Sequence, residues 1–149
     1  MSTHFSGTRA EMRTLDTFIK LTRCTNSVLA RLAERNTVGD LTPSQFSVLE
    51  ALYHLGHMTQ GKVSNKVLKS VSNITTVIDH LERDGLVRRE RDEKDRRVIH
   101  VHLTEAGSRR VEAVLPSHVA ALVEEFSVLT AKEQEALGKL CKKLGRGTK

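Results

Sequence analysis

Residues 70–91, SVSNITTVIDHLERDGLVRRER, decide the fold of this chain because they change from one hydrophobic period to another. In the first half, apolar residues recur at intervals of three and four, which predicts the buried stripe of an amphipathic helix. They are Ile74, Val77, Ile78 and Leu81. Ser70 is expected to cap this helix at its start, and Gly85 to end it. From Leu86 onward the pattern favours a strand.

The residues that follow predict a β-hairpin. Residues 86–91 form its first expected strand, residues 92–96 a charged turn, and residues 97–103 an alternating return strand. One face of the return strand carries Ile99, Val101 and Leu103, and the other carries Val98, His100 and His102. We expect the first of these faces to pack against the core.

Helices are predicted on both sides of this segment, which gives a mainly α fold with one small hairpin. The expected helices are residues 11–36, 43–55, 60–68, 71–84, 104–126 and 131–144. The second begins at Thr42 with a box-like pattern completed by Gln45, and the last begins at Thr130 with Glu133 three residues later. The fifth helix is expected either to end at about Pro116 or to continue through Phe126 with a kink at that proline.

Composition limits the function classes. Among 149 residues, 24 Lys and Arg face 18 Asp and Glu, and the formal charge of +6 suits a polyanionic partner. The absence of Trp argues against a platform that stacks single-stranded bases. There is no signal-peptide pattern, no apolar run of membrane-spanning length, and no cysteine spacing typical of zinc or redox pairs. We therefore expect a single-domain cytoplasmic protein, 1–149, without membrane contact, cofactor or metal.

The order of helices and hairpin within residues 41–104 is that of a winged helix-turn-helix lobe. A helix fits the DNA major groove and needs short hydrogen-bonding side chains on its exposed face. The candidate recognition residues are Ser70, Ser72, Asn73, Thr75, Thr76, Asp79 and His80. Arginines near a hairpin tip suit the narrow minor groove, and acidic neighbours can orient them by pairing. The candidate wing residues are Arg88, Arg91, Lys94, Asp95, Arg96 and Arg97.

Five motifs then resemble the MarR family of DNA-binding regulators. They are LTPSQFSVL at 41–49, MTQG at 58–61, IDHLERDGLV at 78–87, RDEKDRR at 91–97 and VHLTEAG at 101–107. The resemblance is dense over residues 41–107. Outside that range, only the order and length of the helices agree with the family.

The resemblance implies a homodimer in which the N- and C-terminal helices, at 11–38 and 105–144, interlock. It implies a recognition helix in each of two major grooves and a wing in each flanking minor groove. A two-fold dimer also doubles the few base pairs that one winged helix can read. The expected target is therefore a pseudo-palindromic operator on double-stranded DNA.

The resemblance also assigns roles to single residues. Arg97 would enter the minor groove and Asp95 would hold it. Recognition positions fall on Ser72, Asn73, Thr75 and Thr76, and the chain departs from the family at Thr76, where many members carry a basic residue. The implied function is a repressor that responds to a small-molecule effector, whose identity the sequence does not reveal.

Two alternatives remain open at this stage. Cys24 and Cys141 both have basic neighbours in the sequence, and nearby cations can lower a thiol pKa, so a thiol-redox-responsive regulator is one alternative. A winged-helix module that binds another protein is the second. No nucleophile motif, phosphate loop or carboxylate pair points to an enzyme, and the histidine spacings do not predict a metal site.

Overall fold

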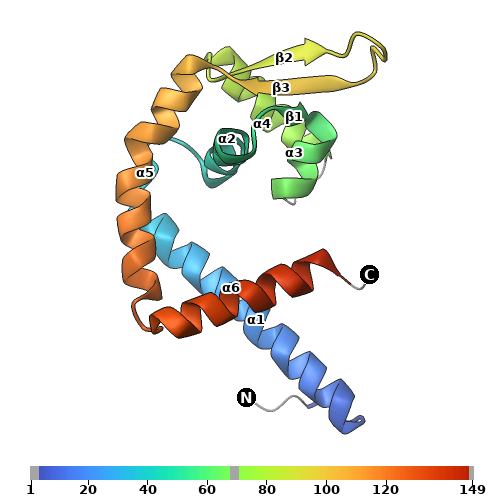
Figure 1. The fold of residues 1–149 in the computed structure, drawn as a ribbon, viewed down its shortest axis with the longest axis vertical. Coiled ribbons are helices and arrows are strands. Elements are labelled where there is room, and N and C mark those ends of the chain that lie inside the picture. The colour runs from blue at the N-terminus through green and yellow to red at the C-terminus, as the bar shows by residue number, and fades with distance from the viewer. Residues whose placement is uncertain (1–3, 68–70, 148–149) are drawn as a thin grey trace. The chain divides into compact units, whose positions relative to one another are not determined.

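The computed structural model describes residues 4–67 and 71–147, except for the side chains of residues 71 and 72. It is mostly helical, with one small antiparallel sheet (Figure 1). In chain order the elements are α1 (Arg9–Arg35), α2 (Pro43–Leu55), β1 (Met58–Thr59), α3 (Gln60–Val67), α4 (Val71–Arg83), β2 (Val87–Arg91), β3 (Ile99–Leu103), α5 (Glu105–Phe126) and α6 (Ala131–Arg146). The predicted winged helix-turn-helix class is confirmed.

The chain divides into two compact units. One comprises Met1–Asn36 together with Ala121–Lys149, and the other comprises Thr37–Ala120. The second unit holds α2, α3, α4 and the whole sheet, and α5 contributes residues to both units.

The core of the 37–120 unit explains why α4 is a helix. Ile74, Ile78 and Leu81 are fully buried on one face of α4, as the sequence spacing predicts. Val77 is half-buried at the edge of that stripe. Val111 of α5 belongs to the same hydrophobic cluster and is also fully buried, so the first half of α5 is part of the winged lobe.

The sheet has the strand order β1-β3-β2. β2 and β3 form the predicted hairpin, with Val87 opposite Leu103 and Glu90 opposite His100. β1 was not predicted, because two residues are too few to show an alternating pattern; it pairs Met58 with Val101. Val101 is therefore paired on both sides and is fully buried.

Local capping fixes where several helices begin. The hydroxyl of Thr42 accepts from the Gln45 backbone N–H at 3.1 Å, and the Thr42 N–H donates to the Gln45 side chain at 3.0 Å. Thr130 and Glu133 form the same reciprocal box at the start of α6. Both predicted boxes are confirmed. Each satisfies backbone donors that the first turn of a helix leaves unpaired.

The other unit contains α1, α6 and the end of α5. Arg31 pairs with Glu125 at 2.7 Å, and Arg35 pairs with Glu124 at 2.6 Å and with Glu125 at 3.1 Å. All of α6 is described, and none of its residues is buried. Large apolar side chains are exposed on all three helices: Phe18, Leu29, Val123, Leu137, Leu140 and Leu144.

In the described part of the chain, no single helix is long and apolar enough to cross a bilayer. Among the helices that the structure describes, only α5 and α6 taken together, bent by 103°, reach that length and composition.

Candidate nucleic-acid interface

The face of α4 opposite its buried stripe is polar. Asn73, Thr76 and His80 are exposed there, while Ile74 and Ile78 point into the core. The capping residue Ser70 lies outside the described residues, and the side chain of Ser72 is not described. The three exposed side chains offer an amide, a hydroxyl and an imidazole, the kinds of group that read base edges.

Two further recognition candidates contact side chains of neighbouring elements. Thr75 is half-buried, which corrects the prediction that it is exposed, and its hydroxyl accepts from the Gln60 amide at 2.9 Å. Asp79 is exposed, but its carboxylate pairs with the Arg89 guanidinium at 2.7 Å. A 3.6-residue period alone assigns both positions to the edge of the exposed face, where neighbouring elements decide what they contact.

The tip of the wing is a turn built on Asp92. One Asp92 carboxylate oxygen accepts from the backbone N–H groups of Lys94, at 3.0 Å, and Asp95, at 2.9 Å. The other oxygen lies 2.9 Å from Nε2 of His100 on β3. The His100 contact and the two N–H bonds all stabilise the charged form, so the pKa of Asp92 lies below its ordinary value.

Asp95 holds Arg97 as the sequence suggested. The Arg97 backbone N–H and Nε both donate to one oxygen of Asp95, at 3.0 and 3.1 Å, and a terminal nitrogen donates to the other at 3.1 Å. This pairing lowers the pKa of Asp95 and raises the pKa of Arg97. The Arg97 side chain is still 90% exposed, so it is oriented without being covered.

The remaining wing candidates are distributed over both strands and the turn. Arg88 pairs with Glu90 at 3.0 Å on the outer face of β2. Arg91 donates to the backbone oxygen of Arg96 at 2.9 Å, which closes the tip. Arg88, Arg91, Lys94 and Arg96 are all exposed, so the hairpin presents a basic surface over its length.

One residue that connects the wing to α4 was not among the candidates predicted from the sequence. Arg89 of β2 is half-buried and contacts α4 through Asp79 and Glu82. A signal was available, because alternation along β2 places Arg89 on the same face as the buried Val87. An arginine on the core-facing side of a strand requires partners.

Three histidines also come together on the outer face of the sheet. The rings of His57 and His102 stack with centroids 4.6 Å apart, and His100 lies 6.3 Å from His57. His102 also lies 3.3 Å from Glu90. Burial is the main cause that lowers the pKa of His102, and the positive charge of Arg88 acts in the same direction.

Among the described residues, the structure defines neither a metal site nor a redox site. Within residues 4–67 and 71–147, no group of three His, Cys, Asp or Glu side chains is arranged to hold a metal ion. Cys24 on α1 and Cys141 on α6 are both exposed free thiols. A redox role for these thiols stays a prediction.

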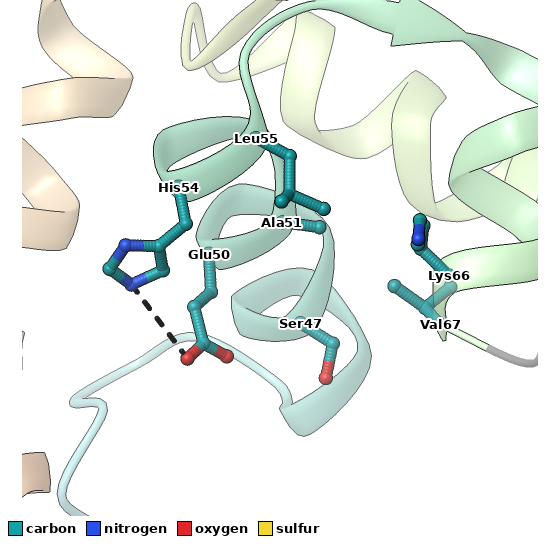
Figure 2. Close-up of a pocket in the computed structure, with 7 residues that line it drawn as sticks. All are labelled: Ser47, Glu50, Ala51, His54, Leu55, Lys66 and Val67. Atoms are coloured by element: carbon teal, nitrogen blue, oxygen red, sulfur yellow. Dashed lines mark ion pairs between the residues drawn. The ribbon is translucent and has the colours of Figure 1, made fainter. Parts of the chain in front are cut away.

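A hollow of about 420 Å³ lies between α2 and α3 (Figure 2). Ser47, Glu50, Ala51, His54 and Leu55 line it from α2, and Lys66 and Val67 line it from α3. His54 and Glu50 lie 4.0 Å apart on its rim. The lining combines apolar side chains with groups of both charges, and no single ligand class follows from it.

Comparison with known proteins agrees with this architecture. The model of the MarR family matches residues 41–99. The transcriptional regulator MhqR of Bacillus subtilis is 33% identical over 92% of this chain and 94% of its own length. The transcriptional repressor MdtR of the same organism is 31% identical over 71% of this chain and 68% of its own. The structure of PcaV from Streptomyces coelicolor, solved with its natural ligand, superposes with a TM-score of 0.72 at 25% identity, over 87% of this chain and 92% of that one.

The family match covers the same stretch that holds the polar face of α4 and the wing tip. The similarity to MhqR extends well beyond it, over nearly the whole of both chains. The chain therefore belongs to the MarR family, whose members are transcription regulators and not enzymes.

Proposed function

We propose that this regulator is a ligand-responsive repressor that binds a specific pseudo-palindromic operator on double-stranded DNA as a homodimer. The observation that carries the proposal is the 37–120 unit, in which one framework holds the polar face of α4 and the basic wing. A rigid recognition helix reads bases, and a basic hairpin binds the flanking backbone and minor groove.

The base-reading residues on the exposed face of α4 are Asn73, Thr76 and His80. Ser72 joins them by resemblance to the family, and Ser70 joins them as the residue that the sequence predicts to cap the helix. An asparagine amide forms a bidentate hydrogen-bonded contact with adenine. A threonine contacts either a base edge or the thymine methyl group. Because Thr76 stands where many relatives carry a basic residue, the operator preference differs from theirs at the base pair that it faces.

The wing supplies the electrostatic part of the interface. Arg97, held by Asp95, enters the minor groove, and Arg88, Arg91, Lys94 and Arg96 contact phosphates along the flanking backbone. Phosphate contacts of this kind give affinity without sequence information and make binding dependent on salt.

We assign the dimer interface to the helices at 11–38 and 105–144, although the first half of α5 also packs in the core of the 37–120 unit. The exposed apolar side chains of α1, α5 and α6 support this assignment, because water-exposed leucines spaced at three and four residues on one helix form a stripe that a partner can cover. In α6 the stripe is Leu137, Leu140 and Leu144.

Repression and an effector are proposed from relatives. MdtR is a repressor, and PcaV is a regulator with a natural ligand. A change in helix packing that alters the spacing of two recognition helices is sufficient to release an operator. The exposed thiols of Cys24 and Cys141 favour oxidation as the alternative signal.

Selection of bound duplexes from a random DNA pool tests the proposal. The full-length protein should enrich one symmetric sequence, and its affinity for that sequence should fall steeply as salt is raised. A winged-helix module that binds proteins would enrich no sequence. Enrichment of a single unrepeated half-site would contradict the dimer.

A further inference from the structure

Arg89 joins the wing to the recognition helix through an extended set of contacts. Its side chain, only 19% exposed, crosses from β2 to α4. One terminal nitrogen lies 2.7 Å from Asp79 and 3.2 Å from Glu82. The other donates to the backbone oxygen of Thr75 at 3.2 Å, and the Arg89 backbone N–H donates to Glu82 at 2.8 Å.

Gln60, the first residue of α3, connects the same region from the other side. Its amide oxygen accepts from Nε of Arg89 at 3.2 Å, and its amide nitrogen donates to the Thr75 hydroxyl at 2.9 Å. Three elements, α3, α4 and β2, therefore meet at one guanidinium. The α4 side of this junction spans two turns, from Thr75 to Glu82.

The hydrophobic stripe of α4 does not by itself fix the axial position and rotation of the helix. Burial of Ile74, Ile78 and Leu81 decides which face of the helix turns inward, but apolar burial has no directional preference. Apolar contacts therefore specify the axial position and rotation of the helix less sharply than oriented hydrogen bonds do. A planar guanidinium that satisfies several acceptors at fixed angles fixes the axial position and rotation of the helix.

We propose that Arg89 is a positioning residue for DNA reading, which sets the register and rotation of α4 without touching DNA itself. Thr75 and Asp79 then serve this junction and do not read bases. The inference rests on the proposed function. It divides the polar face of α4 into an outward set, Asn73, Thr76 and His80, and an edge set that binds Arg89 and Gln60.

The charges at the junction favour positioning over phosphate contact. The single positive charge of Arg89 faces the two carboxylates of Asp79 and Glu82. The group as a whole therefore carries no positive charge with which to release counterions from a phosphate. Loss of Arg89 should change the discrimination between DNA sequences and leave the salt dependence of binding as it was.

The test compares Arg89→Gln and Arg89→Lys with the wild-type protein on two duplexes, the selected operator and a scrambled duplex of equal length and composition. Both variants should bind the operator about tenfold more weakly, the scale of one lost bidentate base contact, and bind the scrambled duplex unchanged. The slope of log affinity against log salt should not change. The lysine variant keeps the positive charge but not the planar guanidinium. A loss of operator affinity in this variant therefore reflects the hydrogen-bond geometry and not the charge.

Arg109→Gln is the matched control, because Arg109 is an exposed arginine in an ion pair with Glu105 on α5, away from this junction. It should leave both affinities unchanged. Circular dichroism of each variant at the assay temperature verifies folding. If Arg89→Gln fails to fold, the lysine variant and Asp79→Asn decide the question.

Asp79→Asn should lower operator affinity without changing the preferred base at any position, whereas a changed base preference would overturn the assignment of Asp79 to the junction. An equal loss of affinity for both duplexes, with a shallower dependence of log affinity on log salt, would show that Arg89 contacts phosphate. An unchanged ratio of operator affinity to scrambled-duplex affinity would contradict its positioning role. If the wild-type protein itself enriches no sequence, the proposed function fails; if it does and the Arg89 variants keep its discrimination, only this inference fails.

Discussion

At the scale of single residues, the wing shows how an exposed arginine is prepared for binding. Arg97 is almost fully exposed, yet three hydrogen bonds tie it to Asp95. Such a pair stabilises folding little, because both groups are solvated and held by a turn. Under the proposed function its value lies in binding, since a guanidinium already held in one orientation loses less freedom when it enters a groove.

Arg97→Ala should weaken operator binding about tenfold per half-site, the scale of one arginine contact to DNA. Asp95→Ala should weaken it less and in the same direction, although removal of a negative charge near DNA would otherwise strengthen binding. Binding isotherms for both single variants and the double variant measure this. Tighter binding by Asp95→Ala, or strictly additive effects, would refute the partnership.

Asn73 should determine the base at one position of each half-site. Its amide lies on the exposed face of α4 near the N-terminal end, which is the end that usually meets base edges. Asn73→Ala should relax the preference at that position and keep the others, and duplex selection with the variant would reveal it. An unchanged selected sequence would place the recognition face elsewhere on the helix.

At the scale of elements, the wing and α5 meet at a close backbone approach. The Thr104 hydroxyl donates to the backbone oxygen of Gly85 at 2.6 Å and accepts from the Gly107 N–H at 3.0 Å. A methyl group at position 107 would lie 2.1 Å from the backbone oxygen of Leu86. Only glycine permits this approach, because the obstacle is backbone and cannot rotate away.

Gly107→Ala should therefore destabilise the folded chain by about 1–3 kcal/mol, the usual cost of an overpacked site. Gly61→Ala in α3 is the control, since an added methyl there meets nothing within 4 Å. It should leave stability unchanged or slightly raised, because alanine favours helix over glycine. Urea unfolding of both variants measures the difference, and equal stabilities would contradict the close approach.

His102 of β3 makes the stability of the folded chain depend on pH, and the sign follows from the direction of its pKa shift. Its pKa lies below the ordinary 6.5, chiefly through burial, with Arg88 and His57 adding positive charge nearby and Glu90 opposing them. The unfolded chain then binds more protons at this group than the folded chain does. Stability is lost as the pH falls through the unfolded value of 6.5.

His102→Gln should consequently lose less unfolding free energy than the wild-type protein between about pH 7.5 and about pH 5.5. Urea unfolding at both pH values provides the measurement. The control is His4→Gln, an exposed histidine ahead of α1, which should follow the wild-type curve. A steeper loss of unfolding free energy for His102→Gln than for the wild-type protein would contradict a lowered pKa for His102.

At the scale of the whole molecule, the proposed dimer would cover large apolar side chains that α6 exposes. On α6, Leu140 is 64% exposed and Leu144 is 65% exposed. Neighbouring large apolar side chains that are exposed to this extent are typical of a surface that binds a partner. Two recognition helices related by a two-fold axis read sites about one DNA turn apart, roughly 10–10.5 base pairs.

Leu140→Glu should shift the protein from dimer to monomer in sedimentation analysis, because the new carboxylate would lose its water at the interface. The same variant should bind the palindromic operator much more weakly. Lys139→Glu, the exposed neighbouring position, is the control and should remain dimeric. A dimer that survives Leu140→Glu would move the interface away from this face of α6.

The sequence by itself determined the elements whose signals are local. The stripe of Ile74, Ile78 and Leu81 and the capping pair Thr42–Gln45 each join residues within seven positions of one another. The Asp95–Arg97 pair is equally local, but it was the resemblance to the family that implied it. Hydrophobic period, cap chemistry and turn geometry express such short-range preferences directly. The same patterns, with the family motifs at 41–107, led to the correct fold class and family.

Only the tertiary structure decided which polar residues are available to a ligand. Thr75 and Asp79 have side chains typical of a recognition helix, but Gln60 and Arg89, fifteen and ten positions away in the sequence, contact them. The two-residue strand β1 likewise forms through antiparallel pairing with β3, a contact between separate elements. Contacts between separate elements depend on how their faces are brought together by burial, and a periodicity within one element does not specify which element lies opposite.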